Sequence, residues 1–368
     1  MQSKPGRLRT CLLMLASVGC GHTEPFSSTP PATDQPFDAL PPIRLTFNQG
    51  PDRGAAWLPD GSGILYSAQQ LGRADHDVCL ALIPPGGGSQ RQLTCDLSPT
   101  GIDSTDAIES PAAGPDGRIA FVARASRIQA ITPENTSIAV ASFTNPTART
   151  RAQIFPYTLP DGAQHSGASQ LRWLTPDVLL YLGERVDYHH PCDRCVEWDT
   201  TTTGVDVVSL DLAQPGSPLE RIPGTENASG ASAGATADQI YYTVNGDSRV
   251  YRRTLSTGLV EVVHDFGPDG LTRDVHVVGN RMAAVVGGRV TYGISPAFGP
   301  TQWDSGGVVH VIDLQSGADV TLDGPGLFRR PQLSPSGTRL VVETYPLIDS
   351  PTGTIVSRRS DLYLYQIP

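Results

Sequence analysis

The chain has almost no lysine, no long apolar stretch and no helical periodicity. Lys4 is the only lysine among its 368 residues, so the other cationic side chains are arginines and eight histidines. A single lysine at the start of the chain excludes Schiff-base chemistry and a phosphate-binding lysine from the rest of it. No window keeps apolar residues at a 3.6-residue spacing over three turns, while 38 glycines and 32 prolines indicate many turns. These features favour an all-β chain.

Positive charge is also scarce. The formal net charge is -10 at pH 7. Such a balance argues against binding nucleic acid or an anionic membrane surface through general electrostatics. We therefore expect no nucleic-acid partner and no cofactor, and we predict a monomer.

One hairpin recurs along the chain and carries the fold prediction. In the stretch from Trp57 to Ala68, a turn with Pro59, Asp60 and Gly61 separates two apolar runs. Proline fixes φ at the first corner, aspartate bonds its own backbone, and glycine accepts positive φ, so this pattern predicts a β-hairpin. Five weaker or equal copies have these residues at the turn: Gly117, Asp177, Asp238, Asn280 and Gly337.

The spacing of the six hairpins predicts the architecture. In chain order, the turn residues are separated by roughly 56, 60, 61, 42 and 57 residues. A repeat of about 40–50 residues or more with four strands in each unit is typical of a propeller blade. We therefore predict a six-bladed β-propeller.

The ends of the repeat region predict how the ring closes. Ile43–Phe47 has the pattern of an outer strand with no blade before it, and Asp361–Ile367 alternates like a strand without a partner after it. Pairing them in the last blade would remove both exposed strand edges. The predicted propeller domain spans residues 43–368. Its long connections, between the second and third strands of the blades, emerge on one face and are 69–76, 125–136, 184–203, 287–306 and 346–360.

Residues 1–20 predict an export signal. A basic start is followed by a short apolar core and by Cys20 at the processing site, as in bacterial lipoproteins. Ser17 stands where leucine is usual, so lipidation of Cys20 and simple secretion both remain open. Residues 21–42 are rich in Pro, Ser and Thr and predict a disordered tether. We expect the domain on the periplasmic side of the envelope or at the cell surface, lipid-anchored if Cys20 is modified.

The repeat resembles that of TolB-like six-bladed propellers. The resemblance is carried by Asp52-x-x-Ala-x-Trp57-x-Pro59-Asp60-Gly61, with Arg44-Leu-Thr46 before it and Tyr66-Ser67 after it. Arg91–Thr94 and Pro331–Gly337 carry it too. Ala55 stands where the family usually has the proline that Pro111 and Pro331 keep. The resemblance implies a binding scaffold in the periplasm or at the surface.

Four cysteines form two predicted pairs. Cys79 and Cys95 lie symmetrically about the turn 84–89, so they face each other across one hairpin and predict a disulfide in an oxidising compartment. Two buried thiols are the alternative. In the run from His189 and His190 to Cys192 and Cys195, a Cys192–Cys195 disulfide is favoured. A tetrahedral metal site or a redox-active pair is the alternative there.

The loops that lead into the blades line the channel of a propeller and supply the candidate binding residues. These are Asp52, Arg53, Asp106, Glu109, His165, Arg273, Asp274, His276, Arg329 and Arg330. Mixed charges at the channel mouth suit a peptide or polar ligand, and a water-filled channel without specific ligand is the alternative. We assign no catalytic residue and predict a scaffold that binds a protein or peptide of the envelope. The alternative is a lyase or hydrolase acting on a sugar or peptide, using His165 or His276.

The intact mass of the mature protein, measured with and without reduction, tests these predictions together. We expect a chain that begins at Cys20 and carries added lipid, and we expect reduction to add the hydrogens of two disulfides. A mature mass without lipid would establish secretion, and a mass unchanged by reduction would contradict both disulfides.

Overall fold

The computed structural model describes residues 42–47, 50–69, 78–94, 107–125, 135–189, 199–214, 219–268, 270–288, 290–295, 299–304, 306–350, 353–356 and 359–367. The chain divides into two units, Met1–Pro30 and Pro31–Pro368, and all described residues belong to the second. The described residues form strands and turns, and they include no helix that could cross a bilayer.

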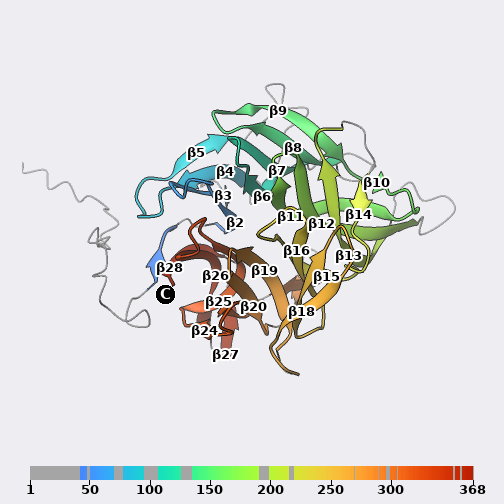
Figure 1. Ribbon diagram of the computed structural model, residues 1–368. Coiled ribbons are helices and arrows are strands. Elements are labelled where there is room, and N and C mark those ends of the chain that lie inside the picture. Colours follow the sequence, from blue (N-terminus) through green and yellow to red (C-terminus); the bar gives the residue numbers. More distant parts are fainter. Residues whose placement is uncertain are drawn as a thin grey trace, which may run out of the picture. The chain divides into compact units, whose positions relative to one another are not determined.

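Six antiparallel blades follow one another along the second unit and are arranged in a ring around a central axis (Figure 1). The first blade contains β2 (Asp52–Trp57), β3 (Ile64–Gln69), β4 (Val78–Ile83) and β5 (Arg91–Thr94). The second contains β6 (Ala107–Ala113), β7 (Arg118–Ala125), β8 (Asn135–Ser142) and β9 (Asn145–Ile154). The third contains β11 (Gln164–Thr175), β12 (Val178–His189), β13 (Asp199–Asp211) and β14 (Glu220–Arg221), with β10 (Tyr157–Thr158) paired to β11.

The remaining blades complete the ring. The fourth contains β15 (Ala228–Ala233), β16 (Gln239–Val244), β17 (Arg249–Thr254) and β18 (Val260–Asp265). The fifth contains β19 (Thr272–Val278), β20 (Arg281–Val286), β23 (Val308–Asp313) and β24 (Asp319–Leu322). The sixth contains β25 (Gly326–Leu333), β26 (Arg339–Ser350), β28 (Asp361–Gln366) and β1 (Ile43–Arg44). The prediction of an all-β, six-bladed propeller is confirmed.

The first two blades share one parallel bridge, Val78 with Ala107, so their strands form one continuous eight-stranded sheet. Each of the two blades still has its own four strands, and within each blade neighbouring strands pair antiparallel. The bridge therefore joins two blades without changing their number.

Three of the predicted connections contain more strand than the sequence indicated. In the third blade β12 and β13 stay paired as far as His189 with Asp199. The fifth blade's connection holds a separate hairpin, β21 (Val290–Ser295) with β22 (Gly299–Asp304), and the sixth holds β27 (Gly353–Val356), which pairs with β26. Antiparallel neighbours can extend their ladder beyond the blade wherever the register continues, so connection length alone does not predict a loop.

The two ends of the described chain close the ring, as predicted. Ile43 pairs with Leu364 and Arg44 with Tyr363, so β1 is the fourth strand of the sixth blade (Figure 1). The contact continues past β1, because the Leu45 amide donates to the Leu362 carbonyl at 2.8 Å. The regular strand is shorter than the predicted 43–47.

A hydrophobic cluster lies at each of the six interfaces between neighbouring blades. Because alternate residues of a strand point to opposite faces of its blade, one strand can contribute to the clusters on both sides. Leu65 packs between the first and second blades, and Tyr66 between the sixth and first. The last interface contains Leu45 from the N-terminal segment and Leu362 and Leu364 from the C-terminal strand. The ring is therefore held by apolar packing that passes once around it.

Leu45→Ala tests this closure. Leu45 is 2% exposed, and truncating a buried leucine removes apolar contacts and leaves a cavity. We expect the free energy of unfolding, from urea denaturation, to fall by about 2–5 kcal/mol. Ile43→Ala is the matched control two residues earlier in the same segment, since Ile43 is 39% exposed, and it should cost less than about 1 kcal/mol. Equal losses in the two variants would contradict closure by packing.

Candidate functional site

A β-bulge on the innermost strand shapes the centre of the ring in all six blades. At the bulge the register with the second strand shifts, and in five of the blades one residue takes a positive φ. The five residues occupy equivalent positions, and their φ angles are Gly54 63°, Ser110 50°, Gln170 51°, Asp274 41° and Arg330 46°. A bulge turns backbone and side chain out of the ladder. The equivalent positions therefore face one another around the channel axis.

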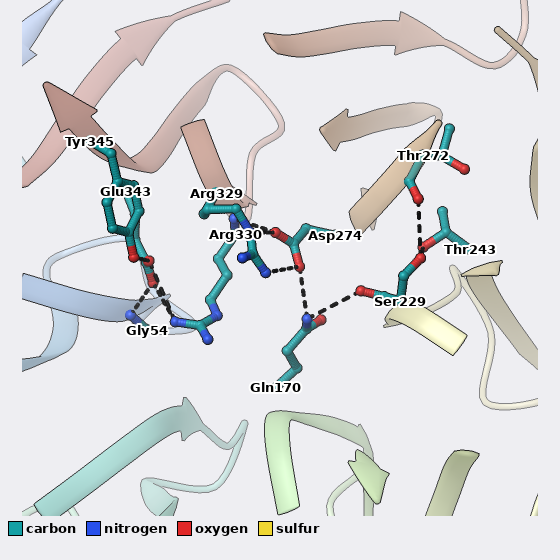
Figure 2. Close-up of polar contacts among 10 residues, drawn as sticks. All are labelled: Gly54, Gln170, Ser229, Thr243, Thr272, Asp274, Arg329, Arg330, Glu343 and Tyr345. Carbon is teal, nitrogen blue, oxygen red and sulfur yellow. Dashed lines mark hydrogen bonds and ion pairs between the residues drawn. The ribbon is translucent and has the colours of Figure 1, made fainter. Parts of the chain in front are cut away.

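Asp274 is the centre of a buried polar network across the channel (Figure 2). Its carboxylate accepts from Arg329 Nε at 2.6 Å, from the Arg330 backbone N–H at 3.0 Å and from Gln170 Nε2 at 2.8 Å. The residue is 2% exposed. Burial alone would raise the pKa of Asp274, but the charges and hydrogen bonds of Arg329 and Arg330 lower it to about 2.

Glu343 of β26 is the second carboxylate of this network. It is fully buried, and it accepts from Arg330 Nη1 at 3.1 Å, from the Tyr345 hydroxyl at 3.2 Å and from the Gly54 backbone N–H (Figure 2). Glu343 raises the pKa of Arg330, and burial followed by Glu343 raises the pKa of Tyr345. Each carboxylate is therefore paired with an arginine, and the arginines keep Asp274 ionised.

The network extends to the other blades through neutral groups. The Gln170 backbone N–H donates to Ser110 Oγ at 3.2 Å, and Gln170 Nε2 lies 3.5 Å from the Ser229 carbonyl. Ser229 Oγ in turn donates to the Thr272 carbonyl at 3.1 Å, and it lies 2.9 Å from Thr243 Oγ1. We call Gly54, Gln170, Ser229, Asp274, Arg329, Arg330, Glu343 and Tyr345 the central network. Together with Ser110 it links all six blades.

A cavity of about 230 Å³ lies at the end of the channel where the first strand of each blade turns into the second. The last residues of all six innermost strands line this turn-face cavity. Its polar and aromatic lining residues are Trp57, Arg172, Trp173, Ser232, His276 and Gln332. Hydrogen bonds between blades frame it, since Trp57 Nε1 donates to the Gln332 carbonyl at 2.9 Å and the Leu333 N–H donates to His276 Nδ1 at 3.0 Å.

Six of the ten predicted channel residues lie on the innermost strands at or directly before the bulge. Arg53, Glu109, Arg273 and Arg329 precede it, and Asp274 and Arg330 form it. The residues before the bulge lie at the end of the innermost strands where the loops lead into the blades. We call this end of the propeller the loop face. His276 lies two positions beyond the bulge, in the turn-face cavity.

The other predicted channel residues lie elsewhere. Asp52 is fully buried, and its backbone N–H donates to the Ser360 carbonyl at 2.8 Å. His165 is also fully buried, with Nε2 3.2 Å from a carboxylate oxygen of Asp206 and its ring against Gly183 inside the third blade. Asp106 lies outside the described residues.

Most of the predicted cysteine and metal chemistry falls outside the described residues as well. Cys20, Cys95, His190, Cys192 and Cys195 are not described, and neither is the side chain of His189. Cys79 lies buried in β4. Both disulfides, the lipid anchor and the metal alternative therefore stay predictions. Within the described part of the chain, no three His, Cys, Asp or Glu side chains cluster as a metal site would require.

Sequence reasoning missed Gln170, Arg172 and Glu343. The two residues of β11 could have been found by counting back from Trp173 as Gly54 is counted back from Trp57. Glu343 gave no such signal, because it belongs to a second strand whose neighbours are apolar.

A Gly-x-Ser-x-Gly sequence, Gly230–Gly234, was also overlooked. It begins inside the extended strand β15 and not at a strand-to-helix turn. Ser232 Oγ donates to the Ala233 carbonyl and accepts from the Val277 N–H, both at 2.9 Å. The hydroxyl is therefore held by backbone groups, unlike an activated nucleophile bonded to a base.

Comparison with known proteins places the fold. No protein-family model and no curated protein sequence matches the chain. TolB from Acinetobacter baumannii is similar in structure, with TM-score 0.50 and 16% identity over 83% of this chain and 64% of that one. This chain thus spans less than two thirds of that TolB.

Two other solved structures are similar over most of both chains. A gluconolactonase from Xanthomonas campestris has TM-score 0.55 and 14% identity, covering 88% of this chain and 89% of its own. The calcium-binding protein regucalcin from Agrobacterium tumefaciens has TM-score 0.55 and 12% identity, covering 89% and 94%. At such identities the similarity establishes the propeller fold alone, which binders and enzymes share.

Asp274→Asn tests the central network. Removing one partner of a buried ion pair leaves the other charge uncompensated, so we expect a loss of about 3–5 kcal/mol in the free energy of unfolding at pH 7. A carboxylate with a lowered pKa stabilises the fold above its unfolded pKa, and that contribution disappears as pH falls towards the folded value of about 2. Lowering the pH from 4 to 2 should therefore reduce the free energy of unfolding, measured by urea denaturation, more in the wild type than in the variant.

Asp247→Asn is the matched control for this variant. Asp247 pairs with Arg249 at 2.8 Å, but the two side chains are 19% and 45% exposed. A surface pair of this kind contributes less than about 1 kcal/mol. Similar losses for the two aspartates would contradict a special role for the central network.

Proposed function

We propose that this chain is a TolB-like binding propeller of the bacterial cell envelope, which holds a protein or peptide partner at the loop face. In this proposal residues 1–20 direct export, a lipid on Cys20 anchors the domain, and residues 21–42 act as a tether. The observation that carries the proposal is the set of charged side chains before the bulges. Arg53, Glu109 and Arg273 surround the channel at equivalent positions, directly outside the central network.

This arrangement favours recognition over proton transfer. A general acid or base needs a pKa near the working pH and a free position beside the reacting atom. Asp274 has a pKa of about 2 and is bonded to two arginines, and Glu343 is buried beneath Arg330 and Tyr345. Both carboxylates are used in fixing neighbouring blades. Charges of both signs at the rim would set the orientation in which a charged partner docks.

An enzyme of the sugar- or peptide-cleaving kind is the second candidate. The observation in its favour is His276, which lines a cavity beside Arg172. Against it, Nδ1 of His276 accepts the Leu333 N–H, and burial and Arg172 lower the pKa of the imidazole to about 3. At neutral pH the ring is therefore a poor proton acceptor.

Site-specific photocrosslinking in intact cells tests the binding role. A photoreactive residue at position 53 lies at the loop face, and one at position 60 lies in the turn at the other end of the same innermost strand. Arg53 and Asp60 are both exposed, so neither replacement disturbs the core. We expect a discrete crosslinked partner from position 53 and none from position 60.

Equal labelling from both positions would contradict a partner at the loop face. So would the absence of any crosslink at position 53 when the variant is folded by circular dichroism. Turnover of a peptide or sugar substrate that is abolished by His276→Ala would replace the binding proposal with the enzymatic one.

A further inference from the structure

The residues that line the turn-face cavity differ in charge from those of the central network. All six blades contribute to its wall, which includes Ala56, Ala112, Ser232, Gln332 and Leu333. Arg172 is the one permanently charged side chain among the lining residues, and none of them is an aspartate or glutamate. The cavity therefore presents a cation without an anion in its own wall.

Arg172 is poorly compensated by the rest of the described chain. Its Nη1 donates to the Leu171 carbonyl at 2.7 Å, and its buried Nε has no hydrogen-bond partner there. The carboxylates that act on its charge, Asp274 and Glu343, are paired with Arg329 and Arg330. Burial lowers the pKa of Arg172 to about 10, so the guanidinium is still charged at neutral pH. A partly buried cation in this state is stabilised by an anion from outside.

His276 offers a second donor to the same space. The Leu333 N–H donates to Nδ1, so in the neutral ring the hydrogen is on Nε2. Burial, followed by the charge of Arg172, lowers the pKa of His276 to about 3, which keeps the ring neutral at physiological pH. A neutral imidazole can donate to an anion without adding charge repulsion to the guanidinium.

We propose that the turn-face cavity binds the carboxylate of a small organic acid, with Arg172 as the ion-pair partner and His276 as an additional hydrogen-bond donor. The guanidinium suits a planar carboxylate because it can donate two parallel hydrogen bonds. Trp57, Trp173 and Leu333 would contact the apolar part of the ligand. A volume of about 230 Å³ lies below the ~300–1,000 Å³ of drug-sized sites, which limits the ligand to roughly the size of one amino acid.

This proposal is independent of the partner at the loop face, because the two sites lie at opposite ends of the innermost strands. Failure of one leaves the other unaffected. Ligand-observed NMR or calorimetry with the purified propeller can therefore test the cavity alone.

Benzoate and benzamide are the probes. They share a ring and a planar head group, but only benzoate is charged at pH 7. We expect benzoate to bind at least about tenfold more tightly than benzamide, since a charge-assisted contact separates them. Equal affinities, or no benzoate binding at millimolar concentration, would overturn the proposal.

Two variants locate the binding. Arg172→Gln should weaken benzoate at least about tenfold and leave benzamide unchanged. His276→Gln keeps a hydrogen-bond donor but removes the ring. It should weaken benzoate binding by a smaller factor than Arg172→Gln does. Arg339→Gln is the control, because Arg339 lies over the Trp57 ring outside the cavity lining. Undiminished benzoate binding in folded Arg172→Gln, or the same loss in Arg339→Gln, would overturn the assignment.

The carboxylate could belong to a free acid or to the end of a peptide. A tripeptide, Ala-Ala-Phe, measured beside its C-terminal amide, separates these sources. Tighter binding of the tripeptide than of benzoate would assign the site to a chain end, and tighter binding of benzoate to a free acid. A tripeptide amide that binds as well as the free carboxylate would contradict carboxylate recognition.

Discussion

Closure of the ring is the constraint on which this structure depends. Each blade is a small antiparallel sheet with two apolar faces, and neither face is covered unless a neighbour lies on each side. The six hydrophobic clusters, one at every interface, satisfy that need only if the last blade meets the first. The cluster between the sixth and first blades contains Leu45, Leu362 and Leu364, and β1 pairs with β28 so that β28 has no free edge. The ends of the domain are therefore structural parts of it.

Closure also determines what can stand at the centre. Six innermost strands converge there, and the bulge in each of them places one residue towards the axis. Arginine and carboxylate side chains at neighbouring positions would be costly to bury alone. They satisfy one another across blades, Asp274 with Arg329 and Glu343 with Arg330, and glycine at 54 admits a positive φ and donates its N–H to Glu343. The channel is thereby divided into a charged rim at the loop face and a separate cavity at the turn face.

This division connects the two proposals. At the rim, Arg53, Glu109 and Arg273 offer charges of both signs over a wide area, which suits a macromolecular surface. Arg172 and His276 line a small cavity in which none of the described lining residues is a carboxylate, which suits a small anion. A propeller can support either use, because function depends on the residues of the site and not on the fold. The central network lies between the two sites and holds the strands that carry both.

The amino-acid sequence alone determined the strands, the number of blades and the closing pair, because turn residues and alternating apolar positions act locally and repeat. It also located the innermost strands, which brought Arg53, Glu109, Arg273, Asp274, Arg329 and Arg330 into the predicted channel. Only the tertiary structure decided that His165 lies inside the third blade against Asp206, that Asp52 is buried, and that Glu343 joins Asp274 at the axis. Local patterns specify which face of a strand a residue occupies. Which charges meet across the channel depends on one-residue bulges and on the packing of blades that are distant in the chain, and neither leaves a local signal.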